Sequence, residues 1–280
     1  MNRLVLCSIL ATLLIVSCTS EKEEIKSKRP NILLIVADDA GYSDFSSYGG
    51  EIPTPNIDAL ANEGILMTDF HVAPNCAPTR AALLSGMDNH LAGLGTMAES
   101  ITENQRGKPG YEEYLNSKVL SLPEVLKEAG CNTYMAGQCH LGAKTREMRP
   151  FGRDFNRSFS MLTGGASHWA DNKPLIPGKA IPYASNGELV EQLPEDFYSS
   201  KNYTDSIISF IAADRKENKP FFAYLAYTAP HNPLHAPKAY IEKYKGLYDS
   251  GWEDMALKRL QRMKELGLVS NGQDAFSYPD

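Results

Sequence analysis

Cysteine is scarce in this chain of 280 residues, and the five that occur are Cys7, Cys18, Cys76, Cys131 and Cys139. So few cysteines exclude a disulfide framework, although Cys131 and Cys139 could either pair or stay free. Basic residues do not dominate, because 28 Lys and Arg face 34 Asp and Glu, for a formal net charge of -6. This balance excludes a broad basic surface for nucleic acid, so an anionic ligand would need local cations.

A long hydrophobic run is also missing at the N-terminus, where the apolar residues 4–16 follow Arg3 and are too short to span a bilayer comfortably. The run ends in Ile15-Val16-Ser17-Cys18, which resembles a bacterial lipobox. The resemblance implies a lipoprotein signal peptide over residues 1–17 and lipidation of Cys18, with residues 18–28 as a polar tether. We therefore expect an exported bacterial lipoprotein, periplasmic or at the cell surface and anchored to the membrane. An ordinary secretory signal or a short membrane anchor remains the alternative.

The rest of the chain has the composition of a soluble globular protein, with 42% hydrophobic and 22% charged residues. Short apolar runs predict strands, and helical spacing of apolar residues predicts helices between them. Strands are predicted over residues 31–36, 133–136 and 221–228, and helices over 56–61, 76–86, 122–129, 203–213 and 253–266. Residues 164–183 and 185–194 are expected to be loops that line a substrate mouth. This alternation predicts an α/β fold with a mostly parallel sheet.

Polar clusters follow three of the predicted strands. Asp38-Asp39 end the first, residues 137–140 follow the second, and Pro230-His231 follow the third. Ligands of parallel sheets bind beyond the carboxyl ends of the strands. The three clusters therefore predict one site at one edge of the sheet, although an isolated Asp-Asp pair or a lone His is more often structural.

The pentapeptide Cys76-Ala77-Pro78-Thr79-Arg80 opens the helix predicted over residues 76–86. Pro suits a first helical turn, and Gly86 suits the stop. A cysteine at a helix N-terminus lies near exposed N–H groups, and Arg80 adds a planar cation one turn later. These residues predict an anion site with a reactive cysteine, the alternative being a buried structural cysteine beside a surface arginine.

Together with residues 29–39, 41–44 and 54–61, this C-x-P-x-R pentapeptide resembles the N-terminal part of the sulfatase family, and residues 90–99 and 107–112 look closest to bacterial arylsulfatases. Residues 130–142 resemble a second family signature. The resemblance implies an alkaline-phosphatase-like sandwich, with a mostly parallel sheet and helices on both faces. It also implies hydrolysis of a sulfate monoester through a formylglycine made from Cys76 by a maturation enzyme.

The resemblance implies roles for the other site residues. Asp38 and Asp39, with converted Cys76, match ligands of a divalent cation, Ca²⁺ or Mg²⁺. Arg80 matches the residue that holds the nucleophile. His140 matches the base that acts when sulfate is released, and His231 matches the histidine at the leaving-group oxygen. His168 is a further candidate for substrate contact.

Residues 130–142 differ from the second family signature at two positions. Gln138 replaces the lysine that contacts sulfate in the family, and Cys139 replaces a tryptophan. Replacing a charge-assisted hydrogen bond should cost about 1.5–3 kcal/mol of transition-state stabilisation. With Gln138 in place of lysine, catalysis is therefore expected to be weakened by about one to two orders of magnitude.

Members of the sulfatase family are roughly twice as long as this chain, and they carry a later Asp-Asn pair and a further lysine. Residues 29–280 are thus expected to form an incomplete N-terminal sulfatase domain, weak or inactive alone. The alternatives are a degenerate, non-catalytic binding protein and a phosphate or phosphonate ester hydrolase of the same superfamily. The natural sulfate ester, whether aryl, alkyl or carbohydrate, stays open.

Overall fold

A six-stranded sheet organises the part of the chain that the computed structural model describes, residues 29–178 and 181–275. The order across the sheet is β1-β6-β2-β3-β4-β5. The strands are β1 (Ile32–Asp38), β2 (Asn132–Gln138), β3 (Arg157–Met161), β4 (Tyr183–Ser185), β5 (Glu188–Val190) and β6 (Phe221–Pro230). The first four in this order pair in parallel, and β4 and β5 add antiparallel strands at one edge. The predicted α/β fold with a mostly parallel sheet is confirmed.

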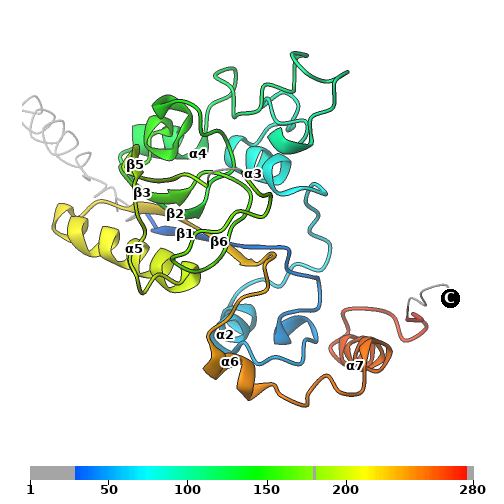
Figure 1. Ribbon diagram of the computed structural model, residues 1–280. Coiled ribbons are helices and arrows are strands. Elements are labelled where there is room, and N and C mark those ends of the chain that lie inside the picture. The colour runs from blue at the N-terminus through cyan, green and yellow to red at the C-terminus, as the bar shows by residue number, and fades with distance from the viewer. Residues whose placement is uncertain (1–28, 179–180, 276–280) are drawn as a thin grey trace, which may run out of the picture. The chain divides into compact units, whose positions relative to one another are not determined.

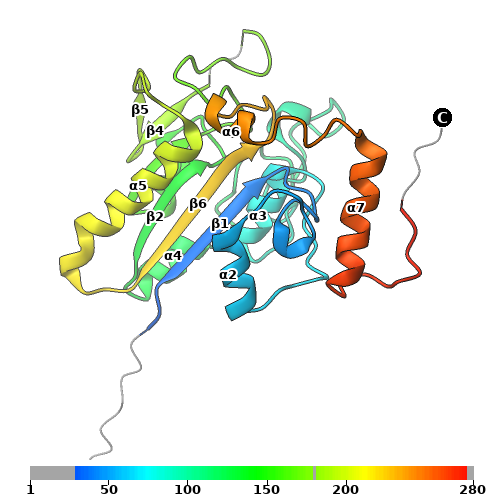
Figure 2. The same ribbon diagram turned by 90° about the horizontal axis from the view of Figure 1, so that it is seen from below.

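Helices cover both faces of the sheet (Figures 1 and 2). Alternate residues of β2 point to opposite faces, as the pleat of a strand requires. Met135 belongs to the core cluster that contains Ala81 and Leu84 of α3 (Cys76–Ser85). Tyr134 belongs to the second cluster, with Tyr203 of α5 (Ser199–Asp214). Strands β6 and β2 are buried along most of their length, and the apolar run of β6 suits this position, whereas β1 lies at the edge of the described sheet with Leu33 and Ile35 exposed.

Local sequence signals set the ends of the helices. Gly86 ends α3 in the left-handed conformation (φ 65°), and its N–H donates to the Ala82 carbonyl. At the start of α4 (Leu122–Glu128), the N–H of Ser121 donates to Glu124 Oε2 at 2.6 Å, as in a capping box. The helix predicted over 56–61 is α2, Pro55–Glu63. These predictions are confirmed to within a few residues.

Other segments differ from the sequence prediction. Strand β3 lies where no strand was predicted, and β4 and β5 form a hairpin inside segments predicted as loops. The turn residues Asn186 and Gly187 have φ of 49° and 89°, which is the backbone a tight two-residue hairpin needs. Helix α5 starts at Ser199, four residues earlier than predicted, and α6 (Lys238–Lys243) was not predicted.

Helix α7 (Trp252–Glu265) is tied to the segment after β1 by a single arginine. Arg259 donates from Nε and Nη2 to the two carboxylate oxygens of Glu51, at 2.6 and 2.8 Å, and from Nη1 to Asp44 at 2.7 Å. Two parallel N–H···O bonds fix the geometry of such a pair. Residues from Asn31 onward belong to one compact unit.

The signal peptide predicted over residues 1–17, the tether over 18–28 and the lipidation site Cys18 lie outside the described residues. Within the described ranges, no helix has the length and apolar character needed to cross a membrane. Cys131 and Cys139, whose pairing the sequence left open, are buried and free.

Candidate active site

Three neighbouring strands bring the predicted site residues to one edge of the sheet. Asp38 ends β1, His140 follows the end of β2 by two residues, and His231 follows β6 directly. Because β1, β6 and β2 are adjacent and parallel, these ends meet (Figure 2). Asp39 (φ 64°) and His140 (φ 52°) are both in the left-handed region. Such backbone is sparsely populated by non-glycine residues and is typical of functional sites.

Cys76 is the first residue of α3, and its side chain lies at the same edge of the sheet, with His140 and His231. Its Sγ lies 3.1 Å from Nδ1 of His140 and 3.5 Å from the Met97 sulfur. The N-terminus of α3 directs unpaired N–H groups and a partial positive charge toward residue 76. Position 76 therefore combines a helix end that favours negative charge with a histidine able to exchange a proton.

His140 lies between two side chains. Nδ1 faces Cys76, and Nε2 faces the carboxylate of Glu99, 3.2 Å from Oε1 and 3.3 Å from Oε2. Burial opposes the imidazolium, but the hydrogen bonds to Cys76 and Glu99 prevail and raise the pKa of His140 from 6.5 to about 9. The imidazole is 7% exposed, so its position is set by these two neighbours and not by solvent.

Arg80 lies one turn further along α3 and is only 1% exposed. Its Nη1 donates to the main-chain carbonyl of Gln138 at 2.9 Å and to the Tyr224 hydroxyl at 3.2 Å. Its Nη2 lies 3.3 Å from Asp38 Oδ2. Desolvation opposes the charge, yet the neighbouring Tyr224 and Asp38 raise the pKa of Arg80. The guanidinium is thus a fixed positive charge beneath the site.

Asp38 and Asp39 supply oxygen atoms of the kind that hard cations take as ligands. The Oδ2 of Asp38 is buried and accepts no hydrogen bond within the described chain. The carboxylate of Asp39 is 62% exposed, 3.7 Å from Nε2 of His231. No group of three or more His, Cys, Asp and Glu side chains in the described ranges is arranged for a metal ion. These two carboxylates fit a cation as part of a ligand set.

A cavity of about 480 Å³ lies at this edge of the sheet, and its lining does not include Asp38, Asp39 or Arg80. Its polar lining includes Cys76, Glu99, His140 and His231. Lys144 and Glu113 stand in the same wall, joined by an ion pair of 2.7 Å. Apolar side chains form most of the rest, and the larger ones are Leu94, Met97, Met148, Leu162, Leu175, Ile176 and Ile181. A cavity with an apolar wall and convergent polar groups is typical of a small-molecule site.

Gln138 and His168, the two predicted substrate contacts, lie outside this lining. Gln138 is fully buried, and neither polar atom of its side-chain amide has a hydrogen-bond partner among the described residues. His168 is 2% exposed, with Nδ1 2.7 Å from Ser199 Oγ and Nε2 3.2 Å from the His231 carbonyl oxygen. Burial is the main cause that lowers the pKa of His168, so a neutral ring accepts from Ser199 and donates to His231.

The sequence predicted no role for Glu99, and it placed Gly164 only in a loop expected to line a substrate mouth. Glu99 stands in the short 3₁₀ helix Ala98–Ser100, far from His140 in sequence. A Cβ at Gly164 would lie 2.5 Å from His140 Cε1 and 3.1 Å from Glu99 Oε1. Only the folded chain shows that these two residues enclose the imidazole, because no periodicity or spacing relates them to residue 140.

The fold and the site agree with what comparison with known proteins finds. The Sulfatase family model matches residues 30–278. An uncharacterized sulfatase of Schizosaccharomyces pombe is 46% identical over 256 residues, which cover 88% of this chain and 46% of the relative. The arylsulfatase of Klebsiella aerogenes is 44% identical over 246 residues, covering 87% of this chain and 52% of the relative. The chain therefore spans about half the length of the curated relatives it matches.

Solved structures give the same result. The crystal structure of Ps i-CgsB superposes with a TM-score of 0.67 at 26% identity, covering 87% of this chain and 57% of that one. A second structure, determined in complex with its substrate D-glucosamine-2-N,6-O-disulfate, gives 0.60 at 26% identity and covers 78% and 38%. Because the family model matches nearly the whole chain around the predicted site residues, this chain belongs to the sulfatase family.

Proposed function

We propose that this chain contributes the nucleophile half of a sulfuric ester hydrolase, of arylsulfatase type, that cleaves a sulfate monoester. The observation that carries the proposal is the convergence of Cys76, His140 and His231 on one cavity, with Arg80 and the two aspartates at the same sheet edge. The relatives add support, because they include an arylsulfatase and an N-acetylgalactosamine-6-sulfatase of Rattus norvegicus, 31% identical over 263 residues (86% of this chain and 48% of the relative).

Residue 76 is the proposed nucleophile position, after a maturation enzyme has converted the cysteine to formylglycine. That group, once hydrated, supplies an oxygen nucleophile for attack on sulfur. The start of α3 favours negative charge at this position. The Nδ1 of His140 lies 3.1 Å from the residue-76 side chain, so it is the nitrogen placed to exchange a proton with this residue.

His231 is proposed to serve the leaving group. Its Nδ1 lies 2.7 Å from the Asn232 carbonyl oxygen, so this nitrogen donates and Nε2 is the one that faces the site. A proton held at Nε2 can pass to the alcohol or phenol oxygen as the ester bond breaks. Arg80 contributes a buried positive charge that lowers the energy of negative charge at the edge of the sheet.

Asp38 and Asp39 are the residues that would hold a divalent cation, Ca²⁺ or Mg²⁺. A bound cation would neutralise charge on the sulfate oxygens. We further propose that the protein is an exported lipoprotein anchored through Cys18, and that its substrate is an aryl, alkyl or carbohydrate sulfate.

The test is turnover of a chromogenic aryl sulfate by protein coexpressed with a formylglycine-generating enzyme, with mass analysis of the peptide around residue 76. We expect conversion of Cys76 and at most slow hydrolysis, because the chain spans about half the length of its relatives, and we expect Cys76→Ala to abolish what hydrolysis there is. Hydrolysis that survives Cys76→Ala would contradict the proposal. Assay of the matching aryl phosphate tests the alternative of a phosphate ester hydrolase. Such an enzyme would turn over the phosphate ester faster than the sulfate ester.

Gln138 favours a second candidate, a protein that binds sulfate esters without turnover. Its amide is buried without a hydrogen-bond partner in the described chain, at the position where the family signature has a lysine. The discriminating measurement is calorimetric binding of an aryl sulfate to protein in which residue 76 has been shown to be converted. Binding without hydrolysis would support this candidate, and hydrolysis would exclude it.

A further inference from the structure

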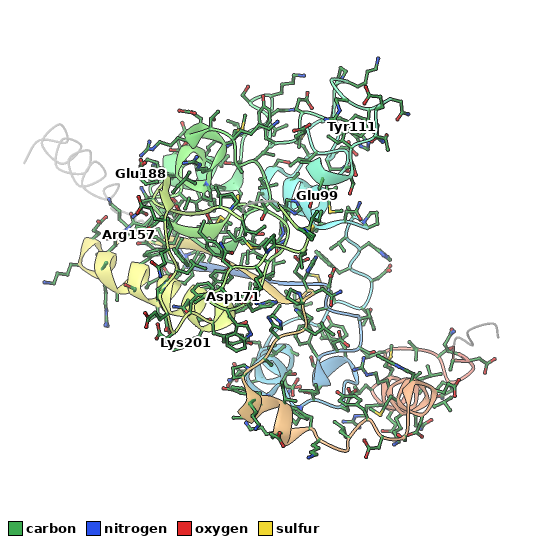
Figure 3. The ribbon with its side chains drawn as sticks, in the orientation of Figure 1. Glu99, Tyr111, Arg157, Asp171, Glu188 and Lys201 are labelled. Atoms are coloured by element: carbon green, nitrogen blue, oxygen red, sulfur yellow. The ribbon has the colours of Figure 1, made fainter. Side chains whose placement is uncertain are left out.

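One carboxylate in the cavity has no part in the roles assigned so far. Glu99 lines the cavity together with Cys76 and His140. It stands in the 3₁₀ helix Ala98–Ser100, and its position is labelled in Figure 3. Its side chain is 32% exposed, so it faces the cavity without being free in solvent. A charged group at this place needs an explanation, because the substrate of the proposed reaction is itself an anion and a carboxylate repels it.

The contacts of Glu99 give that explanation. Both carboxylate oxygens lie within hydrogen-bond distance of His140 Nε2, at 3.2 and 3.3 Å, while Nδ1 of the same ring faces residue 76 at 3.1 Å. A carboxylate can only accept a hydrogen bond, so Nε2 must carry the proton of this contact. Glu99 therefore fixes which nitrogen of His140 exchanges a proton with residue 76.

The backbone supports the same arrangement from the other side of the ring. A Cβ at Gly164 would come within 2.5 Å of His140 Cε1 and 3.0 Å of Nδ1, so the glycine lets the chain pass directly over the imidazole. His140 itself holds a φ of 52°, in the left-handed region. The Glu99 carboxylate and the main chain at Gly164 together hold the His140 imidazole in one orientation, with Nδ1 toward residue 76.

We propose that Glu99 is a positioning residue, whose carboxylate holds the His140 imidazole with Nε2 protonated and Nδ1 directed at residue 76. The kinetic consequence of this proposal rests on the proposed function of residue 76. Its structural consequence, which is the protonation and orientation of the His140 ring, rests on geometry alone.

The kinetic test compares Glu99→Gln and Glu99→Ala with Glu103→Gln in protein shown by mass analysis to be converted at residue 76. Glu103 is a matched control, because its side chain is 96% exposed and its ion pair is with Arg106. We expect Glu99→Ala to lower kcat on 4-nitrophenyl sulfate by about 10- to 100-fold with KM changed by less than about twofold. The isosteric Glu99→Gln keeps an acceptor and the fold, so its loss of kcat should be smaller. Unchanged kcat in both variants would overturn the proposal.

The structural test needs no turnover and uses unconverted protein. In ¹⁵N-labelled protein the Nε2–H proton of His140, assigned with His140→Asn, should be visible and protected from exchange with water. Glu99→Ala should remove that protection, and Glu103→Gln should leave it. Protection that persists in Glu99→Ala would overturn the proposal. Failure of the wild-type protein to hydrolyse sulfate esters would count against the proposed function alone, because the ring measurement is independent of it.

Discussion

The Nη1 of Arg80 donates a hydrogen bond of 2.9 Å to the main-chain carbonyl of Gln138, and so joins the helix that starts at Cys76 to the strand that leads to His140. The same guanidinium lies 3.3 Å from Asp38 at the end of β1. One buried side chain thus connects α3 to two of the three strand ends that form the site. Arg80 positions the site as well as supplying charge to it.

Replacing Arg80 should therefore destabilise the fold. In Arg80→Ala the buried Asp38 loses its cation, and breaking a buried pair from one side costs about 3–5 kcal/mol. Arg80→Lys keeps the charge but loses the planar fork, so we expect about 1–2 kcal/mol. Denaturant unfolding measures both. Arg106→Ala is the control, since this side chain is 58% exposed, and equal losses for Arg80→Ala and Arg106→Ala would contradict the argument.

Replacing Gly137 tests how closely the main chains of β2 and β6 approach each other. Its φ is +115°, and a Cβ would lie 1.8 Å from the Ala226 carbonyl oxygen, which is main chain and cannot move aside. Gly137→Ala should cost about 3 kcal/mol or more, or prevent folding. Gly107 also has a positive φ of +71° but nothing within 4 Å. Gly107→Ala should cost only about 1 kcal/mol, and a larger loss there than at Gly137 would refute the steric account.

Much of the fold could be predicted because its signals are local. The apolar run of β1 and the helical spacing of apolar residues in α4 each depend on neighbours in sequence, and both predictions were confirmed. The Asn186-Gly187 hairpin was missed although this dipeptide is a strong turn signal, because strands of three residues give almost no periodicity. Strand β3 was missed because Ser158 and Ser160 interrupt its apolar pattern and are buried only through tertiary packing.

The site shows the same division. Cys76, Asp38, His140 and His231 could be predicted from motifs and from their places at strand ends, and the structure brings them to one edge. Their chemical roles stay predictions. Glu99 could not be predicted, because its contact with His140 depends on how the chain after α3 folds back. The partners of His168 are Ser199 and the His231 carbonyl, and its contact with substrate stays a prediction.

The attachment of α7 should depend on acidity. Hydrogen bonds from Arg259 lower the pKa of Glu51 from 4.5 to about 2. The folded pKa is below the unfolded one, so the pair stabilises the protein above about pH 4.5 and loses this contribution as pH falls toward 2. The group is partly exposed, so we expect about 1 kcal/mol at neutral pH. Glu51→Gln should lower Tm at neutral pH and match the wild type at low pH. A Tm difference that grows on acidification would contradict this.

Two adjacent glycines distinguish the roles proposed for the two histidines. A Cβ at Gly164 would meet His140 Cε1 at 2.5 Å, whereas a Cβ at Gly165 would meet His231 Cε1 at 3.0 Å and Leu175 Cδ1 at 2.7 Å. Gly164→Ala should displace His140 and lower kcat for all aryl sulfates by a similar factor, about 10-fold or more, because the ring acts on residue 76. Gly165→Ala should act on His231, so its effect should grow as the leaving phenol becomes more basic and needs its proton more.

Rates measured across a series of substituted phenyl sulfates give, for each variant, the slope of log kcat against the pKa of the leaving phenol. The control is Gly272→Ala, where nothing lies within 4 Å of the new Cβ. Equal slopes for Gly164→Ala and Gly165→Ala would mean that the two histidines do not divide the reaction in this way.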